Sequence, residues 1–266
     1  MSLILNIETA TKNCSVSIAK NGEMLFLKEL NDTQYSHAEK LHPFIVAILE
    51  KSKISSKEIS AVAGSKGPGS YTGLRIGVSA AKGFCYPLNI PLIAVDGLQI
   101  LTQGLLDEQK VSSEDAIIPM IDARRMEVFC AIYNYQGERQ TDIEAKIIDE
   151  TSFSDLPCNG KIYLLGDGAA KCKEVLAKSH FVFNDIEHPS TKHLASMSYQ
   201  KFLNSDFEDT AYFEPFYLKD FMVTPQKKKF YIKPREEYVE TELSLVSLFK
   251  TVDAEELVIT NENTSD

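Results

Sequence analysis

The sequence is poor in the patterns that build disulfide frameworks, zinc sites and membrane spans. Its five cysteines are scattered and form no close pair, which argues against a disulfide framework or a zinc site. No apolar run approaches the roughly 18 residues that a membrane-spanning helix needs. We therefore expect a cytoplasmic protein with reduced thiols and no association with membranes.

Histidine pairs with metal-binding spacing are also missing. His37 and His42 are five residues apart, as are His188 and His193, whereas two imidazoles that share a metal on one helical face stand at the i,i+4 spacing. No metal ligand is predicted, which argues against a metallopeptidase.

Basic residues are fewer than acidic residues in this sequence. The chain of 266 residues has 28 Lys and Arg against 38 Asp and Glu, so its formal net charge is −10 and its pI is about 5.1. This balance argues against strong autonomous binding to nucleic acid or to an anionic membrane. The length is sufficient for one large or two modest domains with a real core.

A glycine-rich segment, residues 64–77, is the most informative part of the chain. Its sequence, GSKGPGSYTGLRIG, predicts a tight turn between a strand and a helix, where helix N–H groups could face an anion. The segment fails the Walker A pattern, because Ser70 stands in place of the lysine, and it has one residue too many before Gly73 for a dinucleotide loop. Ser70 also lacks the surroundings of a nucleophile elbow. The spacing favours a packing loop over a phosphate cradle.

The helix expected after this loop carries a row of small side chains. Gly73, Gly77, Ala81 and Cys85 recur every four residues and share one helical face. A glycine inside a helix costs roughly 1 kcal/mol relative to alanine, so Gly73, Gly77 and Gly83 need a compensating contact. We predict the close approach of another helix.

A second unusual helix is expected just upstream. Ser36 and Glu39 match a capping box that starts a helix near His37, and Pro43 is predicted to kink it. An apolar stripe follows, made of Leu41, Phe44, Ile45, Ile48 and Leu49. This stripe fits either a core helix with a wide buried face or a helix that also contacts a partner protein.

Two parts of the chain repeat the same order of elements. The first begins with an apolar strand, residues 3–8, that ends at Glu8; the second begins with one, residues 117–122, that ends at Asp122. A polar turn and a further strand follow each, and Asn21-Gly22 predicts a hairpin in the first copy. Glu8 and Asp122 are either magnesium-water carboxylates of a phosphotransferase or solvated strand-end carboxylates.

The repeat predicts two lobes and an appendage. We expect a first lobe at residues 1–105, a second lobe at 106–225 and a charged C-terminal extension at 226–266. In the extension, a basic cluster, Lys227–Lys229, precedes a stretch from Glu236 onward in which acidic residues dominate. The apolar piece Leu243–Phe249 is expected to dock, and Thr260–Asp266 to stay loose.

Several motifs resemble the TsaB (YeaZ) family. The strongest is GPGSYTGLRIG at residues 67–77, supported by ILNIETAT at 4–11 and SHAEKL at 36–41. Shorter matches at 122–124, 166–169 and 215–218 continue in the same order. The resemblance covers about residues 1–224, and nothing is carried over to the tail.

The resemblance implies an α/β protein with a two-lobed, actin-like and sugar-kinase-like (ASKHA) fold, each lobe a mixed sheet with flanking helices. It also implies a non-catalytic scaffold in the N6-threonylcarbamoylation of adenosine beside the anticodon of tRNAs that read codons beginning with A. In this family the paralogue TsaD performs the transfer, TsaB pairs with it through first-lobe helices, and the ATPase TsaE docks on the pair.

The resemblance also bears on ligands. It implies tRNA contact only through the complex, and no cofactor except ATP or ADP at the junction with TsaD. A homodimer of the isolated chain through the same helices is left open. Glu8 stands where nucleotide-binding relatives usually have aspartate, which argues against an autonomous ATP-dependent phosphotransferase, the main alternative. A glycoprotease-type metallopeptidase is the least favoured alternative.

The two sets of candidate site residues follow from these arguments, and neither includes a catalytic residue or a metal ligand. The predicted partner surface comprises His37, Leu41, Phe44, Ile45, Tyr71, Leu74, Arg75, Gly77, Val78 and Ala81. The vestigial nucleotide cleft comprises Glu8, Thr9, Asp122, Gly166, Asp167 and Gly168.

Overall fold

The computed structural model describes residues 2–32, 36–177, 179–219, 230–232 and 239–241. The chain forms two compact units, Met1–Asp220 and Phe221–Asp266. In the second unit, β11 (Phe230–Ile232) and β12 (Val239–Thr241) form an antiparallel pair. The basic cluster, docking piece and loose end predicted at 227–229, 243–249 and 260–266 lie outside the described residues.

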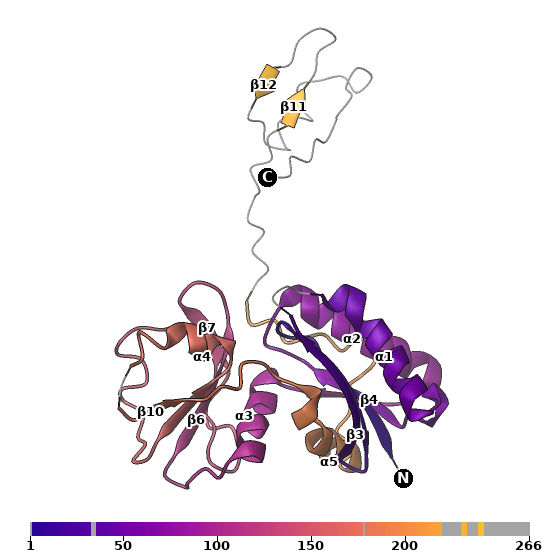
Figure 1. The fold of residues 1–266 in the computed structure, drawn as a ribbon, viewed down its shortest axis with the longest axis horizontal. Helices are drawn as coiled ribbons and strands as arrows, with labels where there is room; N and C mark the ends of the chain where they lie inside the picture. The colour runs from indigo at the N-terminus through magenta and orange to yellow at the C-terminus, as the bar shows by residue number, and fades with distance from the viewer. Residues whose placement is uncertain (1, 33–35, 178, 220–229, 233–238, 242–266) are drawn as a thin grey trace. The chain divides into compact units, whose positions relative to one another are not determined.

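The first unit begins with a five-stranded mixed sheet in the order β3-β2-β1-β4-β5 (Figure 1). Its first three strands are antiparallel and its last two run parallel to β1. The strands are β1 (Leu3–Glu8), β2 (Asn13–Lys20), β3 (Glu23–Asn31), β4 (Ala61–Ser65) and β5 (Leu92–Val95). The hairpin predicted at Asn21-Gly22 is confirmed, since both residues have the positive φ that joins β2 to β3.

Two long helices cover one face of this sheet. They are α1 (His37–Ser52) and α2 (Tyr71–Leu88), and a short 3-10 turn, η1 (Ser56–Glu58), precedes β4. Alternate β1 side chains, Leu3, Leu5 and Ile7, form a core with them because strand side chains alternate between faces. The helix start at His37 is confirmed. The predicted capping box is wrong, because the Ser36 side chain makes no capping hydrogen bond. Pro43 lies inside α1, which continues to Ser52.

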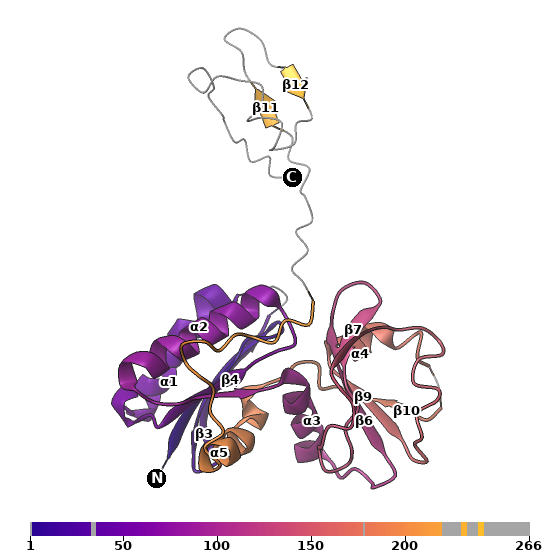
Figure 2. The same ribbon diagram turned by 180° about the vertical axis from the view of Figure 1, so that it is seen from behind.

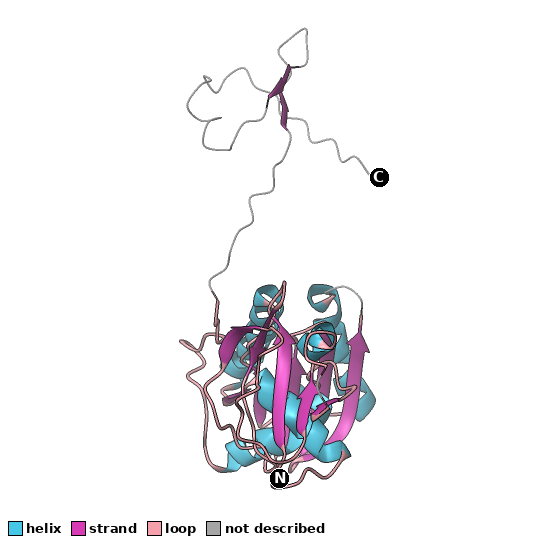
Figure 3. Cartoon of the chain, turned by 90° about the vertical axis from the view of Figure 1, so that its left-hand side faces the viewer, coloured by secondary structure: helices cyan, strands magenta, loops and turns pink. Residues whose placement is uncertain are grey.

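A second five-stranded sheet repeats the topology of the first. Read from its β8 edge, its order is β8-β7-β6-β9-β10, which matches the first sheet strand for strand, with three antiparallel strands followed by two parallel ones. The strands are β6 (Ala116–Asp122), β7 (Glu127–Cys130), β8 (Glu144–Ile147), β9 (Ile162–Leu165) and β10 (Phe181–Phe183). A short helix, α4 (Asp167–Cys172), packs on β6. The predicted two-lobed architecture with mixed sheets is therefore confirmed, and helices flank the strands (Figure 3).

Two further helices cross between the sheets, in a way that differs from the predicted lobe boundaries. Helix α3 (Gly97–Glu108) follows the first sheet, yet Leu98, Leu101 and Leu105 pack on the second. A 3-10 turn, η2 (Thr191–His193), and helix α5 (Ala195–Leu203) follow the second sheet but pack on the first. The segment after residue 190, assigned to the second lobe from sequence, thus completes the first.

Residues 204–219, here called the return segment, run back over the first lobe (Figure 2). Glu208 bridges to Leu92 of the edge strand β5, and Phe213 packs on the first core. The Phe216 N–H donates to the Lys66 carbonyl at 2.6 Å. The segment then reaches the second lobe, where the Lys219 ammonium contacts the Glu127 carboxylate.

Among the described residues, no helix combines the length and apolar character that a membrane crossing requires.

Candidate functional site

The turn after β1 is closed and buried. Glu8 and Thr9 lie inside the protein with Ala10 and Thr11. Glu8 Oε1 accepts the Ala10 N–H at 2.6 Å. Burial raises the pKa of Glu8 to about 7, against the opposing effect of hydrogen bonds from Ala10, Ser65 and Thr9. The Glu8 carboxyl group is therefore buried and bonded to its own turn through Oε1, and it is not a solvated strand-end group.

The glycine-rich segment packs directly on this turn. Thr9 Oγ1 donates to the Gly73 carbonyl at 2.8 Å, and the Ser70 N–H donates to the Ala10 carbonyl at 2.7 Å. A Cβ on Gly69 would overlap Ala10, and one on Gly73 or Gly77 would overlap Thr9. The packing loop favoured from spacing is thus confirmed. The Ser70 hydroxyl accepts the Gly73 N–H at 3.2 Å and caps α2.

The predicted reason for the small-residue row is wrong. Gly73 and Gly77 face Thr9 of the same chain, and Ala81 and Cys85 belong to the core beneath α2. The small side chains of the row let α2 pack closely on the turn after β1 and on the sheet. It is not open to a helix of another protein.

The remaining cleft residues gather at the end of β6. The Asp122 N–H donates to Asp167 Oδ1 at 2.9 Å, and Gly166, with φ of 100°, lies against the Met120 carbonyl together with Gly168. The Lys171 ammonium contacts the Asp122 carboxylate and donates to the Glu127 carbonyl at 2.6 Å. Asp122, Gly166, Asp167 and Gly168 therefore form one cluster.

Asp167 is the most perturbed carboxylate of this cluster. Burial is the main influence and raises its pKa, while the Asp122 N–H and His188 oppose that shift. His188 Nδ1 lies 3.8 Å from Asp167 Oδ2, and burial lowers the pKa of His188. The two groups form a half-buried pair beneath the end of β6.

Of the ten residues of the predicted partner surface, two are accessible to solvent and eight are buried. Arg75 is exposed and Tyr71 half-buried. His37 is buried, with Nε2 2.7 Å from the Thr11 carbonyl oxygen. The other seven, Leu41, Phe44, Ile45, Leu74, Gly77, Val78 and Ala81, are buried within the lobe.

The exposed faces of α1 and α2 lie on other residues. On α1, His42 is exposed, and Val46, four residues later on the same helix, is 52% exposed. On α2, Gly83 is exposed, and a Cβ added to it would meet no neighbouring atom within 4 Å. Tyr86, on the same helix, is 83% exposed. Sequence reasoning noted that Gly83 needs a compensating reason but did not place it at a surface. The available signal for a surface position was that Gly83 lies in the predicted helix but outside the four-residue row of Gly73, Gly77, Ala81 and Cys85.

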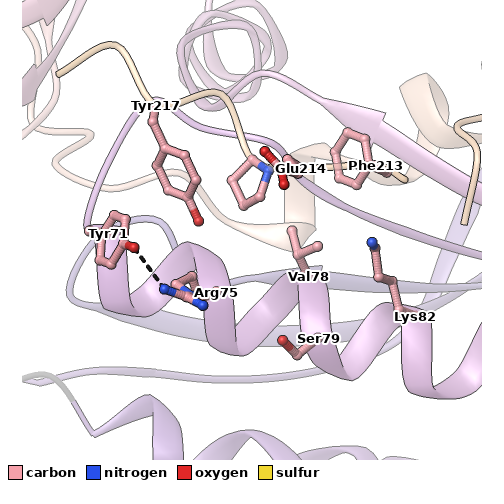
Figure 4. A pocket seen from close by; sticks show the side chains of 9 residues that line it. Tyr71, Arg75, Val78, Ser79, Lys82, Phe213, Glu214 and Tyr217 are labelled. Atoms are coloured by element: carbon pink, nitrogen blue, oxygen red, sulfur yellow. Dashed lines mark hydrogen bonds between the residues drawn. The ribbon is translucent and has the colours of Figure 1, made fainter. Parts of the chain in front are cut away.

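A groove of about 320 Å³ lies between α2 and the return segment (Figure 4). Arg75 donates to the Tyr71 hydroxyl at 2.7 Å, and the Tyr71 and Tyr217 rings are 4.9 Å apart. Lys82 reaches across to the Ala211 carbonyl at 3.1 Å. The lining residues are Tyr71, Arg75, Val78, Ser79, Lys82, Phe213, Glu214, Pro215 and Tyr217. Sequence reasoning missed this groove because it assigned residues 213–217 to the other lobe.

Comparisons with known proteins agree on one family. The family model described as "TsaD: tRNA N6-adenosine threonylcarbamoyltransferase" matches residues 31–232. The "tRNA threonylcarbamoyladenosine biosynthesis protein TsaB" of Haemophilus influenzae is 26% identical, over 82% of this chain and 93% of the relative. TsaB of Buchnera aphidicola subsp. Acyrthosiphon pisum is 34% identical, over 56% of this chain and 68% of the relative.

Solved structures show the same likeness. "YeaZ from Pseudomonas aeruginosa" superposes with a TM-score of 0.69 at 25% identity, covering 82% of this chain and 100% of that one.

Proposed function

Because the chain belongs to the TsaB (YeaZ) family and has a role in tRNA threonylcarbamoyladenosine biosynthesis, we propose that it is a non-catalytic subunit of the modifying complex. In this proposal it works in the cytoplasm and pairs with TsaD, and TsaE docks on the pair. TsaD transfers the threonylcarbamoyl group to adenosine next to the anticodon. The tRNA engages the chain only after assembly, which agrees with the net charge of −10.

The closed β1 turn supports a non-catalytic role. In this turn the Ala10 N–H is bonded to Glu8, and Thr9 and Ala10 are covered by α2 and the glycine-rich segment. A phosphate would need free backbone N–H groups at such a turn. The alternative, an autonomous phosphotransferase, would have to displace the helix to gain access.

The exposed face of α1 and α2 is the surface that we propose for TsaD. The single observation that carries this assignment is Gly83, a helical glycine with open space where its side chain would be. Its cost to the helix is unexplained within the lobe, and a closely approaching partner helix would explain it. Tyr86 and Val46 supply exposed apolar surface on the same two helices.

The test is the affinity of Gly83→Gln for the cognate TsaD, measured by calorimetry with co-purification as a first screen. The substitution has room in the free chain, so the variant should fold at least as well as wild type. Its side chain should obstruct the partner and weaken binding by about 10-fold or more, since overpacking a tight contact costs about 1–3 kcal/mol. The matched control is Ala170→Gln, on the exposed side of α4, which should bind normally. Unchanged affinity of a folded Gly83→Gln would mean that the surface lies elsewhere.

A further inference from the structure

The hairpin turn between β6 and β7 contains two adjacent arginines in an unfavourable backbone conformation. Arg124 has φ of 70° and Arg125 has φ of 52°. Residues with a Cβ are disfavoured in this left-handed region, and hairpins that need two such residues in succession favour Asn-Gly. The local backbone therefore gives no reason for arginine at either position.

The turn is held without help from either guanidinium group. Asp122 Oδ1 accepts the Arg124 N–H at 2.8 Å. The Ala123 N–H donates to the Glu127 carbonyl at 3.1 Å, and the Glu127 N–H donates to the Arg124 carbonyl at 3.2 Å. Both arginines are exposed. Within residues 2–32, 36–177 and 179–219, neither guanidinium makes an ion pair or a hydrogen bond.

The carboxylates beside the turn are already neutralised by lysines. Lys171 contacts Asp122, and Lys219 of the return segment contacts Glu127. Asp167 lies deeper, with its side chain 22% exposed and its oxygen on the Asp122 N–H. The charges of Arg124 and Arg125 are thus left unbalanced at the surface, in a chain whose net charge is −10.

We propose that Arg124 and Arg125 form a phosphate-contact site that holds the backbone of the RNA substrate once the complex has assembled. The proposal rests on the proposed function, because an RNA substrate reaches this chain only through that role. A guanidinium group matches a phosphate with two parallel N–H donors. Two contacts are too few to overcome the acidic surface of the chain alone, so the site adds to RNA binding by the partner.

The test uses the assembled complex of this chain with its cognate TsaD and a fluorescent tRNA. Binding is followed by anisotropy over a series of salt concentrations. For Arg124→Gln/Arg125→Gln we expect about 10-fold weaker binding at low salt, and a slope of log K against log salt that is smaller by about 1.5 to 2. The control, Lys110→Gln/Lys161→Gln, removes two exposed charges elsewhere in the same lobe and should leave the affinity and the slope close to wild type.

A second variant separates RNA contact from a structural role. Arg124→Asn/Arg125→Gly suits the backbone of the turn, so it should raise the melting temperature while it weakens RNA binding as much as the glutamine pair does. Wild-type RNA affinity in both variants would overturn the proposal. Loss of TsaD binding in the variants would overturn it too and would make the turn a contact for an acidic protein surface. Failure of the proposed function is distinguishable, because the wild-type chain would then also fail to assemble.

Discussion

Thr9 and Gly73 are 64 residues apart in sequence and in direct contact in the structure, where Thr9 Oγ1 donates to the Gly73 carbonyl at 2.8 Å. A side chain on Gly73 would overlap the Thr9 backbone. This contact fixes the start of α2 on the turn after β1. It therefore ties the proposed partner helix to the buried turn that follows β1.

Gly73→Ala should destabilise the protein although alanine is the better helix former. The added Cβ meets backbone that cannot move aside cheaply, so we expect a loss of about 1–3 kcal/mol in the free energy of unfolding. Urea denaturation followed by circular dichroism measures it. Gly83→Ala, on the open face of the same helix, is the control and should gain up to about 1 kcal/mol. Equal stability changes at both positions would show that the Thr9 contact does not constrain Gly73.

Glu8 should make stability fall as pH rises. Its folded pKa is about 7 against the ordinary value of 4.5, so between these values the folded state holds a proton that the unfolded state has lost. The stabilising contribution is complete below pH 4.5 and disappears as pH approaches 7, a loss of about 3 kcal/mol. Glu8→Gln should remove this component from a stability profile measured between pH 4.5 and 8.

The comparison for that profile is Glu174→Gln, at an exposed carboxylate of the second lobe. This variant should keep the wild-type pH profile. A Glu8→Gln profile with the same fall as wild type would mean that folding does not raise the pKa of Glu8.

A non-catalytic chain should not bind or hydrolyse ATP with magnesium when it is alone. Calorimetric titration and phosphate release test this directly. In the reconstituted complex, Glu8→Gln should leave tRNA modification within a few-fold of wild type, because the Glu8 side chain is buried beneath the surface and bonds to the Ala10 N–H of its own turn. A loss of several orders of magnitude with TsaD binding intact would indicate a cryptic active site.

Removal of Phe221–Asp266 should leave a folded protein. The unit Met1–Asp220 contains both five-stranded sheets and all of the helices described above, so the remaining chain retains its cores. We expect normal binding to TsaD and normal modification by the complex. Insolubility of the truncated chain would show that the second unit completes the fold.

The strand pattern could be predicted from the sequence because it depends on local alternation and on repeated order. The strands ending at Glu8 and Asp122, and the hairpin at Asn21-Gly22, are local signals of this kind. Helix α3 was not predicted. It carries Gly97 and Gly104, which disfavour a helix locally, and its leucines gain their stability from β6 and its neighbours.

The candidate sites were less predictable because their contacts join distant parts of the chain. The four-residue spacing of Gly73 and Gly77 indicates a close approach but does not identify Thr9 as the neighbour. The groove joins α2 to Phe213 and Tyr217, which follow it by more than a hundred residues. No local pattern links those positions.

The exchange of α3 and α5 between the sheets sets an order for synthesis on the ribosome. When β5 emerges, one face of the first sheet still lacks the cover that Leu194 and the residues packed around it provide. That cover becomes available only after Leu203, the last residue of α5, has left the exit tunnel. A nascent chain therefore cannot finish its first lobe before the strands of its second lobe have been made.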